Sequence, residues 1–154
     1  MSILINFEVF PILIVHINRY QSIDVQTSSK PTGFELIWTD AGSGADYDVK
    51  VYSLTPQPGY KCLGHVAVSS GTPSLSSYRC VRDDFVEYVP LKPYATWDDQ
   101  GSGAFTDFAA YDIQDSSSVI DMGVFWSEAE YNQPINKNVP ALKKQRSVQC
   151  IDIC

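Results

Sequence analysis

Aspartates gather around two short glycine-rich runs, and these are the places where the sequence could do chemistry. The first run is Gly42-Ser43-Gly44 and the second is Gly101-Ser102-Gly103. The aspartates around them are Asp40, Asp46 and Asp48 in the first case, and Asp98, Asp99 and Asp107 in the second. Carboxylate oxygens around a tight turn suit Ca²⁺. A calcium site at Asp40, Asp46 and Asp48 is therefore one hypothesis.

A structural role for the same carboxylates is the competing interpretation. The aspartates that occur in both runs are Asp40 and Asp48 in the first and Asp99 and Asp107 in the second. Asp46, by contrast, is matched by Phe105. Asp48 and Asp107 stand at the mouth of the following segment, where a carboxylate can accept backbone N–H bonds from the turn. Because a turn cap explains the recurring pair without a metal, we expect no metal and no other cofactor.

Both runs belong to one longer pattern that occurs twice, 59 residues apart, as Trp38 and Trp97 show. The match extends as far as Gly64 and Gly123. In each copy a short stretch of β-formers precedes the glycines and an alternating stretch follows them. Glycine at the turn permits positive φ. We therefore predict two twisted hairpins, and structural roles for Trp38, Gly42, Gly44, Trp97, Gly101 and Gly103.

The two hairpins need a further layer, because a single hairpin is only marginally stable in water. The length of 154 residues predicts one domain, residues 1–154, and the many aromatic, glycine and proline residues favour an all-β fold. We predict a β-prism-like domain with internal repeats at about 34–92 and 93–149 and a third sheet from the terminal segments. A β-sandwich is the alternative. The predicted core comprises Trp38, Trp97, Tyr52, Tyr111, Leu63 and Met122.

The remaining segments are assigned from their local patterns. Further strands are expected at 62–68, 78–82 and 119–126, and a loop at 132–138. Residues 83–85 fit either a helical turn or an edge strand. The apolar residues 1–15 are too few to span a membrane and lack the basic start and cleavage site of a signal peptide. We interpret them as one or two strands split at Pro11, the alternative being a leader that does not fold with the rest.

Charge and cysteine usage exclude some classes of function. The formal charge of −7 argues against nucleic acid as a partner. A basic stretch near the C-terminus favours a solvated tail, the alternative being a site for anionic lipid; its residues are Lys137, Lys143, Lys144 and Arg146. Cys62 and Cys80 flank a loop and can face each other across a hairpin. Two reduced thiols are the expected state in a cytosolic protein.

No catalytic motif is present. His65 near Asp48 or Cys62 is the candidate base, and an ordinary imidazole is the simpler interpretation. The sequence contains no nucleophile elbow, phosphate-binding loop or dinucleotide fingerprint. Active sites are usually unique, whereas a motif that is used twice indicates a scaffold. We therefore expect that the protein is not an enzyme.

A family resemblance is carried by three stretches, namely residues 38–45, Asp48-Val49 and residues 58–67. They resemble the vacuolar protein sorting-associated protein 62 family, and related repeats occur in the adaptor-binding region of vacuolar protein sorting-associated protein 13. The resemblance spans roughly residues 34 to 126. It implies a non-catalytic recognition module in membrane trafficking, cytoplasmic and peripheral to membranes, that binds a protein adaptor or membrane lipid.

The opposing hypothesis is a secreted or toxin-associated β-prism that binds glycan or lipid. A disulfide between Cys62 and Cys80 would favour it, whereas free thiols would favour the trafficking module. Under either hypothesis the turn tips are the candidate binding region, because their aromatic rings can stack on sugar or insert at a membrane. The candidate binding residues are Asp40, Asp48, Asp99, Asp107, Tyr47 and Phe105.

Overall fold

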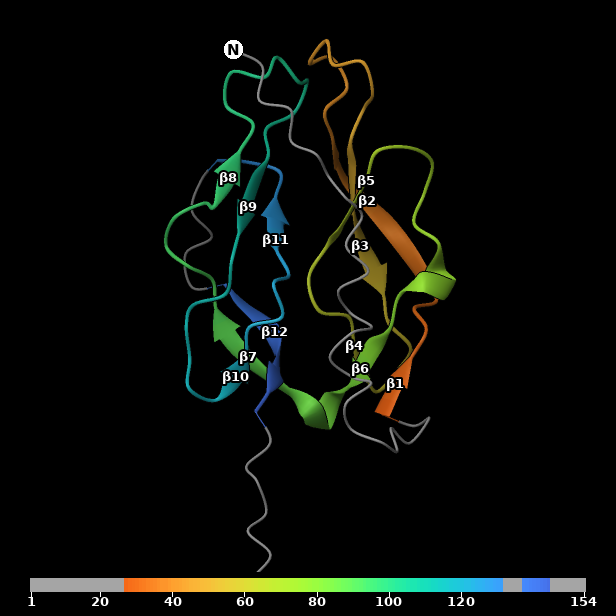
Figure 1. Ribbon diagram of the computed structural model, residues 1–154, viewed down its shortest axis with the longest axis vertical. Coiled ribbons are helices and arrows are strands. Elements are labelled where there is room, and N and C mark those ends of the chain that lie inside the picture. Colours follow the sequence, from red (N-terminus) through yellow and green to blue (C-terminus); the bar gives the residue numbers. More distant parts are fainter. Residues whose placement is uncertain (1–26, 132–136, 145–154) are drawn as a thin grey trace, which may run out of the picture.

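The computed structural model describes residues 27–131 and 137–144, and these form twelve short strands in four three-stranded antiparallel sheets (Figure 1). The strands are β1 (Ser28–Ser29), β2 (Gly33–Thr39), β3 (Lys50–Thr55), β4 (Tyr60–Lys61), β5 (Val66–Val68), β6 (Cys80–Arg82), β7 (Val86–Pro90), β8 (Trp97–Asp98), β9 (Ala109–Tyr111), β10 (Val119–Ile120), β11 (Trp126–Glu128) and β12 (Asn138–Lys143). Two 3₁₀ turns, η3 (Leu75–Ser77) and η4 (Asp83–Phe85), complete the described elements. The predicted all-β class is confirmed.

The strands divide into two halves with the same strand order. The first half, β1 to β6, contains the sheets β1-β6-β4 and β2-β3-β5. The second half, β7 to β12, contains the sheets β7-β12-β10 and β8-β9-β11. The halves stand side by side in Figure 1, each with one sheet above the other. Each half therefore has two sheets, where we expected one hairpin per half and a single shared third sheet. The strands that we assigned to residues 1–15 lie outside the described residues.

The strand pairing follows the sequence offset for most of its length. Trp38 pairs with Val51, and 59 residues later Trp97 pairs with Ala110. Beyond the hairpins the offset changes to 60, because Tyr52 pairs with Val66 whereas Tyr111 pairs with Trp126. One additional residue of the second half therefore lies just before β11.

Several of the predicted segments differ from the structure. Residues 62–68 and 119–126 are not continuous strands, because Gly64 and Gly123 have φ of 76° and 64°, which a strand does not accommodate. Residues 83–85, for which a helical turn and an edge strand were both open, form the 3₁₀ turn η4. Of the loop expected at 132–138, residues 132–136 lie outside the described residues. Part of the expected solvated tail forms β12, the central strand of its sheet, because Val139 and Ala141 are buried there.

Two hydrophobic clusters form the core. One joins the halves and combines Trp38 and Val51 of the first with Phe108 and Ala110 of the second. The other lies within the second half, and its buried members are Val89, Leu91, Ala109, Tyr111, Ile113, Val119, Val139 and Ala141. Of the predicted core residues, Trp38, Tyr52 and Tyr111 are buried, and Leu63 and Met122 are partly buried. Trp97 was predicted wrongly: it is 45% exposed, because the cluster that joins the halves includes Trp38 but not Trp97.

Cys62 and Cys80 form a disulfide, so the expectation of two reduced thiols is wrong. The register explains the pairing: Tyr60 lies opposite Arg82 and Lys61 opposite Val81, which brings Cys62 opposite Cys80. The corresponding positions of the second half hold Asp121 and Ala141. There β7 and β12 pair over five residues, whereas β1 and β6 pair over two. The disulfide thus secures the sheet that has the shorter ladder.

We expect reduction of this disulfide to lower the free energy of unfolding by about 3 kcal/mol, because it closes a loop over a separation of 18 residues. The measurement is urea unfolding with and without reductant in a Cys150→Ser/Cys154→Ser background, which leaves Cys62 and Cys80 alone. Equal stability under both conditions, or two free thiols in the oxidised protein, would contradict the pairing.

Candidate functional site

Each glycine-rich turn is closed by a carboxylate and a backbone pair. The Val49 N–H donates to Asp40 Oδ1 at 2.6 Å, and the Phe108 N–H donates to Asp99 Oδ1 at 2.8 Å. The Asp40 N–H donates to the Val49 carbonyl, and that of Asp99 to the Phe108 carbonyl, both at 3.1 Å. The caps are therefore Asp40 and Asp99, and not Asp48 and Asp107 as we expected. The carboxylate that precedes the glycines reaches across the turn to the strand that follows.

The glycines and serines complete the same bond pattern in both turns. The N–H of Ser43 donates to the Asp40 carbonyl at 3.0 Å, and that of Ser102 to the Asp99 carbonyl at 2.8 Å. The serine hydroxyls accept the N–H groups of Ala45 and Ala104 at 3.2 and 3.1 Å. All four glycines have positive φ, as predicted, namely Gly42, Gly44, Gly101 and Gly103. Two matching, internally bonded turns result.

The two turns touch each other. The Phe105 N–H donates to the Ala41 carbonyl at 3.1 Å, and the buried Trp38 Nε1–H donates to the Thr106 carbonyl at 2.8 Å. The Phe105 ring lies so close to Gly42 that a Cβ there would come within 2.7 Å of it. Both turns lie at the upper end of the molecule in Figure 1. They form one continuous region.

We call the exposed side chains of this region the tip surface. Its members are Asp46, Tyr47, Asp48, Phe105 and Asp107. Tyr47 is 78% exposed and Phe105 is 83% exposed. Neither ring belongs to a core cluster, so packing of the core does not explain why large aromatic side chains stand on these turns. Of the six candidate binding residues, four therefore lie on the tip surface, while Asp40 and Asp99 serve the turns beneath it.

The two capping aspartates differ in their surroundings. Asp99 is only 4% exposed, and it also accepts the Ser102 hydroxyl at 3.2 Å and the Tyr131 hydroxyl at 2.8 Å. The hydrogen bond to Asp99 raises the pKa of Tyr131. Burial raises the pKa of Asp40, and the charge of Asp48 adds to that effect. Within residues 27–131 and 137–144, no three acidic, histidine or cysteine side chains are placed to hold a metal ion.

A second contact between the halves lies where the loop before β5 meets β11. The His65 N–H donates to the Phe125 carbonyl at 2.9 Å, and the Ser127 N–H donates to His65 Nδ1 at 3.0 Å. A Cβ on Gly64 would lie 2.6 Å from Val124 Cβ. We call this contact, made by Gly64 and His65 with residues 124–127, the seam. His65 thus has Ser127 as its partner, and not Asp48 or Cys62 as we considered.

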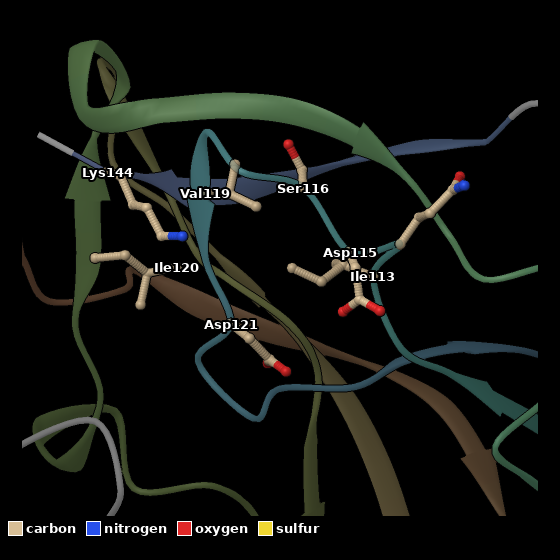
Figure 2. Close-up of a pocket in the computed structure, with 8 residues that line it drawn as sticks. Ile113, Asp115, Ser116, Val119, Ile120, Asp121 and Lys144 are labelled. Atoms are coloured by element: carbon tan, nitrogen blue, oxygen red, sulfur yellow. The ribbon is translucent and has the colours of Figure 1, made fainter. Parts of the chain in front are cut away.

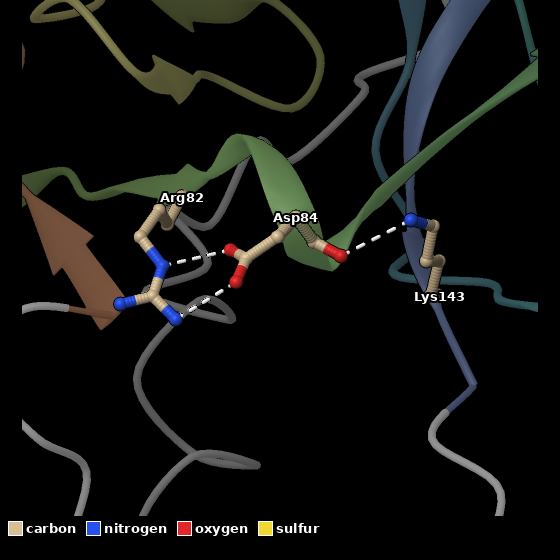
Figure 3. A network of polar contacts seen from close by, with 3 residues as sticks. All are labelled: Arg82, Asp84 and Lys143. Carbon is tan, nitrogen blue, oxygen red and sulfur yellow. Dashed lines mark hydrogen bonds and ion pairs between the residues drawn. The ribbon is translucent and has the colours of Figure 1, made fainter.

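The basic residues near the C-terminus are partly engaged in the fold. Lys143 donates to the Asp84 carbonyl at 3.1 Å, and Asp84 pairs with Arg82 at 2.7 Å (Figure 3). Lys137 forms an ion pair with Glu128. Lys143 and Lys137 therefore contribute to contacts within the protein instead of forming a free basic cluster. No helix in the described parts of the chain is long and apolar enough to cross a membrane.

A small open pocket lies at the other end of the second half, and sequence reasoning gave no sign of it (Figure 2). Its volume is about 250 Å³. Ile113, Val119 and Ile120 supply apolar walls, and Asp121 and Lys144 are charged residues in its lining. It shares no residue with the tip surface.

Comparisons with known proteins give two findings. The family model described as vacuolar protein sorting-associated protein 62 matches residues 6–151. The solved structure of GNIP1Aa from Chromobacterium piscinae is similar with a TM-score of 0.65 and 26% sequence identity, over 78% of this chain and 25% of that chain. The similarity thus spans about a quarter of the length of GNIP1Aa. No curated protein matches the chain.

The seam yields a prediction with a matched control, because Gly64 and Gly123 correspond in the two halves. Both have positive φ, but a Cβ at Gly123 would meet nothing within 4 Å. We expect Gly64→Ala to cost about 1–3 kcal/mol more unfolding free energy than Gly123→Ala, because it forces the seam apart. Chemical denaturation of both variants measures the difference. Equal losses would show that the halves do not meet at this glycine.

Proposed function

The chain belongs to the vacuolar protein sorting-associated protein 62 family, and from that premise we propose a non-catalytic recognition module in vacuolar protein sorting that binds a protein partner through its tip surface. The observation that carries the proposal is the exposure of Tyr47 and Phe105, at 78% and 83%, on turns fixed by matching hydrogen bonds. Aromatic side chains are enriched at protein interfaces. A surface that is already ordered loses little entropy on binding.

The charge of the tip surface favours a protein over an anionic membrane. Asp46, Asp48 and Asp107 are exposed beside the two rings, and the whole chain carries −7. Anionic leaflets attract clusters of basic residues and repel acidic ones. The partner that fits this surface offers positive charge to the carboxylates and apolar or cationic groups to the rings.

The matching bond patterns support a scaffold that is not catalytic. The same turn occurs in both halves, and Asp40 and Asp99 use their carboxylates to hold it. We therefore interpret the two halves as a duplicated unit. The described serine–histidine contact, between His65 and Ser127, lies in the seam, and Ser127 is only 3% exposed. A nucleophile in that place has no access to a substrate.

A secreted glycan-binding β-prism is the second candidate, and the disulfide between Cys62 and Cys80 favours it. Disulfides persist in oxidising compartments and are rare in the cytosol. The rings of Tyr47 and Phe105 would then stack on sugar, with carboxylates of the tip surface accepting hydroxyl groups. This candidate uses the same surface and differs in ligand and location, so one set of variants tests both.

We expect the double variant Tyr47→Ser/Phe105→Ser to keep its thermal stability and to bind its partner at least about tenfold more weakly, since central interface aromatics contribute about 2 kcal/mol or more. The control is Tyr94→Ser, which removes a ring that is 81% exposed but lies in the β7–β8 connection. Wild type, double variant and control are immobilised and exposed to one cell extract, and the bound proteins are quantified by mass spectrometry.

A protein retained by wild type and control but lost from the double variant is the expected result. Retention of the same proteins by all three would contradict a binding role for the tip surface. Binding to acidic vesicles that the double variant loses would replace the protein partner with a membrane. Binding to immobilised glycans that depends on the same two rings would support the second candidate instead.

A further inference from the structure

The seam contains the one described histidine, and its hydrogen bonds fix its protonation state. His65 Nδ1 lies 3.0 Å from the Ser127 backbone nitrogen and 2.7 Å from the Ser127 hydroxyl oxygen. A backbone N–H can only donate, so Nδ1 must be the acceptor and must lack a proton. The imidazole in the closed seam is therefore neutral, with its proton on Nε2.

The surroundings of the ring oppose a second proton. Burial, followed by the positive charge of Lys137, lowers the pKa of His65 to about 4. The ring packs edge-on against Trp126, with centroids 5.0 Å apart, and against Phe125, with centroids 6.5 Å apart. Among the elements packed here, β11 carries Glu128, which pairs with Lys137, and β5 carries no titratable side chain.

A proton on Nδ1 would convert the acceptor into a donor that faces another donor. The Ser127 N–H would lose its partner in a place where Ser127 is only 3% exposed, so water could not replace the lost bond without opening the contact. The new positive charge would also lie near Lys137. Both consequences are relieved when the loop at Gly64 and His65 moves away from β11.

We propose that His65 makes the seam acid-sensitive, so that its protonation separates the first half from β11 of the second half. The tip surface is built from turns of both halves, joined through Phe105 and Ala41. Opening the seam would change the relative position of these turns. A partner held there would be released as the pH falls; this last step rests on the proposed function, whereas the opening itself does not.

The direction of the pH dependence follows from the lowered pKa. An exposed histidine of the open form has an ordinary pKa near 6.5. The preference for the closed seam is therefore complete above about pH 6.5 and declines as the pH falls towards 4. Over this interval the ratio of closed to open forms decreases by up to about 300-fold, at up to about tenfold per pH unit.

The test follows the His65 ring by NMR and the tryptophan emission between pH 7.5 and 3.5. A His16→Gln background leaves His65 as the sole imidazole, since the sequence has two histidines. We expect one coincident acid transition in both signals. Ser127→Ala removes a hydroxyl contact that stabilises the closed seam, so it should shift the transition to higher pH. Lys137→Met removes the charge that opposes a protonated ring in the closed seam, so the emission change should weaken or move to lower pH. His65→Gln should abolish the ring signal and move the emission change to lower pH.

The proposal is overturned if the emission change keeps the same midpoint in wild type and Ser127→Ala, or if it moves to higher pH in Lys137→Met. It is also overturned if the His65 ring titrates near pH 6.5 while the emission stays constant. Because neither readout needs a partner, the test remains decisive when the binding role of the tip surface fails. Conversely, partner release at acid pH that persists in His65→Gln would leave recognition intact and exclude this seam as its control.

Discussion

The hydrogen bond from the Trp38 indole to the Thr106 carbonyl is the contact on which the arrangement of the halves depends. Trp38 is 4% exposed and packs on Phe108 with ring centroids 4.6 Å apart, so its N–H must find a partner inside the protein. The partner is a backbone carbonyl in the turn of the other half. This bond therefore ties the edge strand β2 to the second turn, next to the core cluster that contains Trp38 and Phe108.

The two turns and the seam support different parts of the proposed activity. The carboxylates of Asp40 and Asp99 accept backbone N–H groups that a flexible loop would leave to water. The rings of Tyr47 and Phe105 remain exposed. The seam at His65 joins the same halves through polar bonds that depend on protonation. The Trp38 contact between the halves thus relies on an indole that does not titrate, whereas the seam relies on an imidazole that does.

The sequence predicted those features that local chemistry determines. A glycine pattern with a constant offset predicts turns with positive φ, and the structure has them. The same offset predicts a buried tryptophan in each half, which holds for Trp38 but not for Trp97, because burial depends on what packs against the strand. It did not predict which aspartate caps the turn, because Asp40 and Asp48 flank the same glycines and only the path of the chain separates them. The disulfide depends on the register of β4 and β6, which strands of two and three residues do not reveal. Likewise, the partner of His65 is 62 residues away in the chain.

The central claim is that the two turns form one ordered region before any partner binds. Amide hydrogen exchange at Phe105 tests it most directly, because the side chain of Phe105 is 83% exposed while its N–H is bonded to Ala41 in the other half. We expect slow exchange at Phe105, comparable to that of Val49 and Phe108, whose N–H groups the aspartates hold. Fast exchange at Phe105 beside slow exchange at the other two would show that each turn is ordered alone and that the tip surface is not a single region.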